Sequence, residues 1–163
     1  MNRKQHLSRF LFGVLVLVFL LGANLAAKAQ STKRDPKVVQ LVNGSGYQAK
    51  DFGDGIWLLD LKGTQKPKIE LLLASGPDFV VFGVILATKS EMSVNAEMMF
   101  KLMKFNNAYD YVKLGFDNDD DLFLRAEIKT KSLDRTEFNE TIERVRKDAD
   151  EVFGAIKPYL TRR

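Results

Sequence analysis

The sequence predicts an α+β fold in which three helices accompany a mostly antiparallel sheet of about five to six strands. Three observations support this prediction. Apolar and polar residues alternate over short runs, as they do in half-buried strands. Short stretches rich in Gly, Asp and Asn separate these runs, which favours antiparallel pairing. One long segment near the C-terminus instead repeats its apolar residues at spacings of three and four, as an amphipathic helix does.

The start of the chain is typical of an export signal. Three basic residues among the first nine precede an apolar run over 10–23, and Ala27–Ala29 supplies the small-x-small pattern that signal peptidase recognises. We therefore expect residues 1–29 to be a cleaved signal peptide and residues 30–163 to form a single domain in the periplasm or outside the cell. The alternative is an uncleaved segment that anchors the domain in the inner membrane, although the run is shorter than the roughly 20 residues that span a bilayer.

Removing the signal changes the charge balance. Basic residues fall from 25 to 21, which equals the 21 acidic residues, so the remaining domain has no net charge. Nucleic-acid binding needs a basic surface, and we expect no such partner. We expect membrane contact only through the signal segment if it stays uncleaved. His6, the one histidine, leaves with the signal, and the chain has no cysteine. Disulfides, Ser-His triads and His/Cys metal sites are therefore excluded from the exported domain.

A first helix is expected from Asp35-Pro36, because Asp caps helices and Pro fits the first turn. Gly44 ends it. The turn over 44–49 also matches the GxGxxA variant of the dinucleotide fingerprint, which requires a helix directly after it. A second glycine turn follows within a few residues, so we favour a helix-to-strand turn over a cofactor loop.

Four strands should follow, over residues 47–52, 56–62, 69–74 and 79–87. The second and fourth are apolar on both faces, as expected for strands that lie in the middle of a sheet or are covered on both sides. A methionine-rich helix is expected over about 94–106, capped by Ser90 or Ser93. Methionine at helical spacing usually fills a core, but its flexible thioether can also repack around varied partners.

An aspartate-rich turn over 117–121 joins two further strands, over 112–116 and 122–129. Its alternate aspartates match the first three ligand positions of a calcium loop. The Gly and Glu positions of that loop hold Leu122 and Ile128, both expected in a strand. We therefore expect a solvated hairpin turn, with no metal and no cofactor.

The long C-terminal helix has a well-marked start. Asp134 suits the N-cap and Glu137 its reciprocal partner, while Leu133 and Phe138 can form a hydrophobic staple. An apolar stripe continues to residue 160, so this helix should lie on the sheet. The opposite face is expected to be charged and exposed, with Glu143, Arg144, Arg146, Lys147, Asp148 and Asp150.

With its elements in this order, the chain resembles the YbjN-type family of bacterial sensory transduction regulators over nearly all of residues 35–160. That family is similar in fold to the type III secretion chaperones. The resemblance implies a type III secretion chaperone-like fold and brings no catalytic residues. The matching segments are the first helix running into Gly46-Tyr47, the helix end at 102–106, the hairpin Val112–Phe116 and Asp121–Glu127, and Leu133-Asp134.

These observations predict a non-enzymatic, chaperone-like binding domain that acts through contacts with a protein partner or a second copy of itself. The outward face of the hairpin combines aromatic side chains with arginine, as interfaces do. The alternative is a carrier that holds a small apolar ligand or lipid between sheet and helices. An enzyme using carboxylates alone lacks an enclosing pocket at the hairpin tip. The predicted partner surface comprises Tyr111, Phe123, Arg125, Met98, Met99 and Met103.

Overall fold

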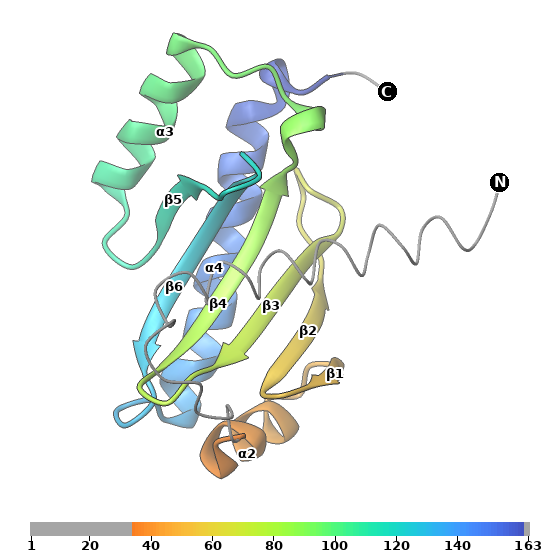
Figure 1. Cartoon of the computed structure of the whole chain (residues 1–163), viewed down its shortest axis with the longest axis vertical. Coiled ribbons are helices and arrows are strands. Elements are labelled where there is room, and N and C mark those ends of the chain that lie inside the picture. Colours follow the sequence, from red (N-terminus) through yellow and green to blue (C-terminus); the bar gives the residue numbers. More distant parts are fainter. Residues whose placement is uncertain (1–33, 162–163) are drawn as a thin grey trace, which may run out of the picture.

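The structure is a computed structural model that describes residues 34–161. These residues form one sheet, a long helix along it and shorter helices near its ends (Figure 1). The order of α-helices and strands confirms the predicted α+β fold. The elements are α2 (Pro36–Gly44), β1 (Ala49–Gly53), β2 (Ile56–Leu61), β3 (Ile69–Ser75), β4 (Phe79–Ala87), the 3-10 helix η1 (Lys89–Glu91), α3 (Ala96–Ala108), β5 (Lys113–Phe116), β6 (Leu122–Lys129), α4 (Arg135–Ile156) and the 3-10 helix η2 (Lys157–Tyr159).

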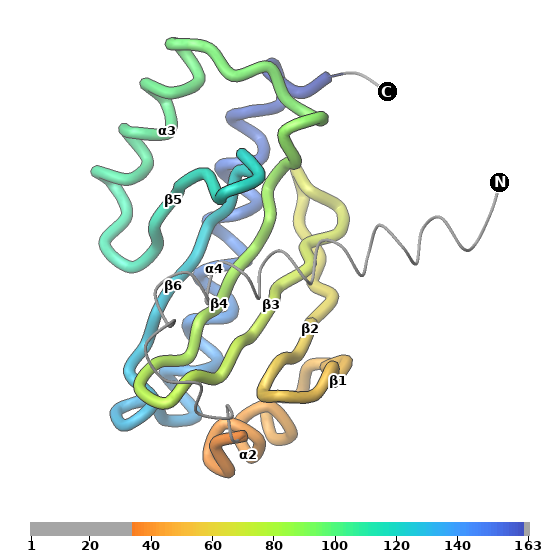
Figure 2. Tube along the Cα trace, viewed as in Figure 1, coloured from red at the N-terminus to blue at the C-terminus, as the bar shows by residue number. Residues whose placement is uncertain are grey.

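The sheet has the strand order β1-β2-β3-β4-β6-β5, and every neighbouring pair is antiparallel. The first four strands follow one another across the sheet. The chain then leaves β4, passes through α3 beyond the end of the sheet, and returns to form the far edge strand β5 before β6 fills the gap (Figure 2). β4 therefore lies in the interior of the sheet, as its apolar character on both faces predicted.

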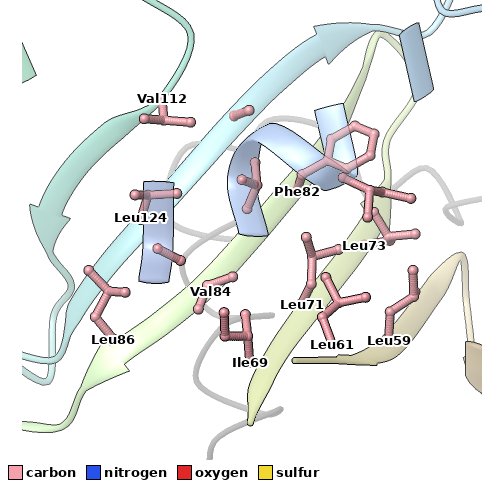
Figure 3. Packing of buried hydrophobic residues seen from close by; sticks show 14 of the residues in the cluster. Leu59, Leu61, Ile69, Leu71, Leu73, Phe82, Val84, Leu86, Val112 and Leu124 are labelled. Atoms are coloured by element: carbon pink, nitrogen blue, oxygen red, sulfur yellow. The ribbon is translucent and has the colours of Figure 1, made fainter. Parts of the chain in front are cut away.

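The main core lies between α4 and one face of the sheet. α4 packs against β3, β4 and β6, and the alternating side chains of β4 that face it, such as Phe82 and Val84, are fully buried (Figure 3). The Phe82 ring meets Phe138 of α4 edge-on, with 5.5 Å between ring centroids. The predicted apolar stripe is confirmed, because all its helical members are buried: Phe138, Ile142, Val145, Ala149, Val152 and Ile156.

The predicted starts of the first and last helices are also confirmed. The carboxylate of Asp35 accepts a hydrogen bond from the backbone N–H of Lys37 at 2.8 Å. Asp134 accepts one from the backbone N–H of Glu137, also at 2.8 Å. Each carboxylate satisfies one of the backbone donors that a helix leaves unpaired in its first turn.

Three local predictions need correction. The cap of α3 is Asn95, which accepts from the backbone N–H of Met98 at 2.9 Å. Ser90 lies instead inside η1, so the helix starts later than its serines suggested. Strand β5 begins only at Lys113, and Tyr111 therefore precedes it. Alternation alone did not show where pairing with β6 begins.

The glycine turn after α2 leads directly into strand β1, so the helix-to-strand turn is confirmed. The hairpin between β1 and β2 turns at Asp54 and Gly55, whose φ angles are 47° and 76°. Two successive residues with positive φ are what a type I′ hairpin turn requires.

Asp150 attaches the loop between β2 and β3 to α4. Its carboxylate accepts hydrogen bonds from the backbone N–H groups of Thr64, Gln65 and Lys66 at 3.0, 2.7 and 2.8 Å. Burial acts to raise the pKa of Asp150, but these three donors, together with the positive charge of Arg146, lower the pKa below its ordinary value. The carboxylate thus organises a loop that would otherwise have unpaired backbone donors.

The predicted signal peptide, residues 1–29, lies outside the described residues. Among residues 34–161, no helix combines the length and the apolar character needed to cross a membrane.

Replacing Asp134 by Ala should destabilise the fold by about 1 kcal/mol, because the first turn of α4 loses its side-chain acceptor. We expect a fall in thermal midpoint of about 4 °C, measured by circular dichroism. Asp134→Asn keeps an acceptor oxygen and should retain most of the wild-type midpoint. Equal losses in the two variants would contradict a capping role.

Candidate functional site

Helix α3 exposes three large apolar side chains to solvent. Phe100 is 61% exposed, Met103 is 66% exposed and Met99 is 37% exposed. They lie three or four residues apart or are adjacent, so they share one side of the helix. We call Met99, Phe100 and Met103 the α3 surface.

The opposite side of α3 packs against the domain. Met98 and Leu102 belong to the core, and α3 contacts α4 and β5. The prediction of Met98 as a partner-surface residue is therefore wrong, because its side chain has no exposed area. Phe100 was not among the residues predicted for the partner surface. Apolar residues occur on almost every side of this helix, which is more than one core-facing stripe requires. This excess in the sequence indicates that some apolar side chains of the helix are exposed.

Basic side chains border the α3 surface. The Nζ of Lys104 lies 4.7 Å from the centroid of the Phe100 ring, a cation–π arrangement. Lys101 lies 3.4 Å from the carboxylate of Glu97 and 5.1 Å from the ring of Tyr159. The α3 surface is thus apolar at its centre and partly cationic at its rim.

Of the hairpin residues in the predicted surface, Tyr111 and Arg125 line one open groove of about 400 Å³ together with Phe79. Tyr111 is 50% exposed, and the guanidinium of Arg144 on α4 stacks on its ring at 3.9 Å. Phe123 and Arg125 are half-buried on the sheet face opposite α4. There the Arg125 guanidinium lies 5.2 Å from the centroid of the Phe123 ring. Gly115 on the neighbouring strand leaves room for that ring. The six predicted residues therefore do not form one site.

The sheet face opposite α4 carries no helix of residues 34–161 (Figure 1). We call it the open face. Its side chains include Val81 and Ile85, which are half-buried, and Phe79, which is 42% exposed. Leu58 and Leu72 are cross-strand neighbours on this face that are buried but lie outside the main core cluster. The open face is therefore a second apolar surface, as expected when three helices accompany six strands.

The aspartate-rich turn uses its carboxylates to hold itself together. Asp117 accepts hydrogen bonds from the backbone N–H groups of Asp119 and Asp121, both at 2.9 Å. Lys89 donates from its backbone to Asp121 at 2.7 Å and pairs through its Nζ with Asp120 at 2.6 Å. Within the described part of the chain, no three His, Cys, Asp or Glu side chains converge to hold a metal ion.

An open groove runs between α4 and the segment 108–111 that links α3 to β5. Its volume is about 730 Å³. Asp148 lines this groove but is only 8% exposed. The prediction that Asp148 belongs to the exposed charged face of α4 is therefore wrong. Asp148 lies three residues after Val145 and four before Val152, so helical spacing places it at the edge of the apolar stripe, where it lines the groove beside residues 108–111.

Two acidic groups in the groove lack compensating partners. Burial raises the pKa of Asp148, and the negative charge of Glu151 raises it further, although Lys147 and Arg144 oppose the shift. The hydroxyl of Tyr109 is buried and makes no hydrogen bond of ordinary geometry among residues 34–161, although Glu151 is close enough to accept a weak one. Burial raises the pKa of Tyr109, and the charges of Glu151 and Asp148 and the contact with Glu151 add to this effect.

Comparison with known proteins identifies solved structures with a similar fold. No protein-family model matches the chain, and no curated protein matches its sequence. Among solved structures, YbjN from E. coli, described as a candidate transcription regulator, aligns with a TM-score of 0.56 and 12% identity over 77% of this chain and 93% of its own. This chain has a YbjN-like fold.

The chaperone SpcU is a second neighbour, from the heterodimeric ExoU–SpcU complex of the type III secretion system of Pseudomonas aeruginosa. It aligns with a TM-score of 0.55 and 19% identity, over 73% of this chain and 97% of its own. The predicted YbjN-like and type III secretion chaperone-like architecture is therefore confirmed. At these identities the likeness is one of fold.

Asp148→Asn should stabilise the protein at neutral pH, because it removes a buried charge that has no hydrogen-bond donor and that Lys147 and Arg144 compensate only in part. The raised pKa means that the folded state binds this proton more tightly than the unfolded chain does. The advantage of the variant should therefore be full above the folded-state pKa and vanish below pH ~4, where both states are protonated. Thermal midpoints of the two proteins between pH 3 and pH 8 measure this. A variant less stable than wild type at neutral pH would contradict the assignment.

Proposed function

We propose that this protein is an exported, non-enzymatic binding domain with a chaperone-like role, and that it contacts other proteins through the α3 surface. One observation carries the proposal. Of the six large apolar side chains exposed on the described residues, Met99, Phe100 and Met103 lie on α3 and Val94 lies just before it. Apolar exposure concentrated on one element is typical of an interaction site.

The composition of the α3 surface suits a partner that varies in detail. Methionine side chains adjust their shape around different apolar groups, and burying each large apolar side chain stabilises a complex by at most about 1.5–3 kcal/mol. Lys101 and Lys104 at the rim favour a partner segment with acidic residues beside its apolar ones.

The fold likeness supports a protein partner. SpcU forms a heterodimeric complex with ExoU, so a fold of this kind can present a protein-binding surface. A second copy of this chain is the other candidate occupant of the α3 surface. Light scattering separates the two, because self-association would give twice the mass of one chain.

The remaining predictions of function rest on the sequence. The N-terminal pattern supports export, and the absence of His and Cys from residues 30–163 supports a non-enzymatic role. A carrier of apolar ligands gains no support, because the groove beside α4 is open and lined largely by charged residues.

The triple variant Met99→Ser, Phe100→Ser, Met103→Ser tests the proposed surface. We expect it to lose most binding to a permanently unfolded, reduced and alkylated protein, measured by fluorescence anisotropy, because the apolar contact area is gone. Its thermal midpoint should stay near that of wild type, since these side chains are exposed. Phe79→Ser, which removes an exposed apolar side chain of the open face, is the matched control and should bind normally. Loss of binding in the control alone would reassign the site to the open face, and binding unchanged in the triple variant would reject the α3 surface.

Export can be tested separately. Expressed in a bacterial host, the chain should accumulate in the periplasm or medium with Gln30 as its first residue, as N-terminal sequencing would show. A protein that retains Met1 and sediments with the inner membrane would support the anchored alternative, and a processed protein would exclude it.

A further inference from the structure

The groove beside α4 has an acidic character that the proposed protein-binding surface does not use. Five carboxylates and three cationic side chains line it. Arg146 pairs with one of these carboxylates, since its Nε donates to Glu143 at 2.9 Å, and Arg144 stacks on the ring of Tyr111 at 3.9 Å. With five carboxylates against three cations, the lining has an excess of two negative charges.

Among these five carboxylates, Asp148 is the one whose burial destabilises the protein most. It is more than nine-tenths buried, and no residue between 34 and 161 donates a hydrogen bond to it or forms a salt bridge with it. Burying an ionised carboxylate without donors destabilises a protein. Its side chain nevertheless lines the groove, where a ligand could reach it.

Tyr109 adds a second unsatisfied group on the facing segment. It is the C-cap residue of α3, and its ring packs against Phe105 with 5.5 Å between centroids. That packing fixes the position of the ring, while its buried hydroxyl has no hydrogen bond of ordinary geometry among the residues described and only a weak one towards Glu151. A phenol oxygen can accept a hydrogen bond as well as donate one.

A positively charged ligand with N–H donors suits both groups, because it supplies a counter-ion to the carboxylate and hydrogen bonds to both oxygens. An alkylammonium group has three such donors and a guanidinium group has five. We propose that the groove between α4 and residues 108–111 binds a primary ammonium or guanidinium group, with Asp148 as its counter-ion and the Tyr109 hydroxyl oxygen as a second acceptor. Glu151 and Glu140 line the same groove and attract the cation towards it.

This chemistry has two sources, a free amine or the side chain of a lysine or arginine in a peptide. Isothermal titration calorimetry of the full chain at low ionic strength distinguishes them with two probes. Putrescine represents the free amine, and a short end-blocked peptide with one lysine represents the side chain. Binding of putrescine alone assigns the site to a free amine, and binding of the peptide assigns it to a side chain. Heat from neither probe at millimolar concentration would overturn the proposal.

Substitutions locate the binding. Asp148→Asn should weaken it about tenfold or more, because the counter-ion is lost. Tyr109→Phe removes one acceptor and should weaken it about threefold to tenfold. Asp60→Asn makes the same chemical change at an exposed position of β2 outside the groove, and should leave the affinity unchanged. Equal affinities of Asp148→Asn and Asp60→Asn would overturn the proposal.

A third variant covers the case in which Asp148→Asn fails to fold. Glu151→Gln removes a negative charge from the same groove at an exposed position, and it should weaken binding severalfold while the thermal midpoint stays close to that of wild type. An affinity equal to that of wild type would count against the site. The α3 surface and the groove are separate and can be altered independently. The α3 triple variant should therefore lose binding to an unfolded protein and still bind the amine probe with wild-type affinity.

Discussion

The structure depends on the packing of α4 along one face of the sheet. Its apolar stripe is fully buried against β3, β4 and β6, and the edge-on contact of Phe82 with Phe138 lies within this layer. Each buried side chain of that size contributes about 1.5–3 kcal/mol, so this layer supplies much of the stability of the domain. Because α4 covers only one face of the sheet, the opposite face and the two shorter helices are available for other roles.

The two shorter helices lie near the ends of the sheet (Figure 1). α3 needs only one apolar side to do this, and Met98 with Leu102 provides it. Phe105 also packs against the core, whereas Met99, Phe100 and Met103 remain exposed, and their exposure costs solubility without adding to the core. That imbalance is the physical basis for assigning binding to α3 rather than to the hairpin.

Periodicity and capping predicted most of the fold, because both act within a few residues of the chain. The alternation of β6 and the Asp134 cap depend on local geometry, and the structure has both. The site was harder to predict, since exposure depends on distant segments. Met98 could not be assigned to the core because α3 is apolar on several sides. Asp148 lies at the edge of the apolar stripe of α4, where its spacing from Val145 and Val152 agrees with burial but its residue type suggested exposure.

Asp148 and Asp150 show how differently one side-chain type can behave within two residues of one helix. Asp150 receives three backbone N–H donors from the loop between β2 and β3, and its pKa is lowered. Asp148 receives no donor from residues 34–161, and its pKa is raised. Burial acts to raise the pKa of both; the three donors and the charge of Arg146 reverse this effect for Asp150, whereas the charge of Glu151 adds to it for Asp148. A ligand carrying N–H groups would therefore do for Asp148 what residues 64–66 do for Asp150, and would convert a destabilising carboxylate into a binding one.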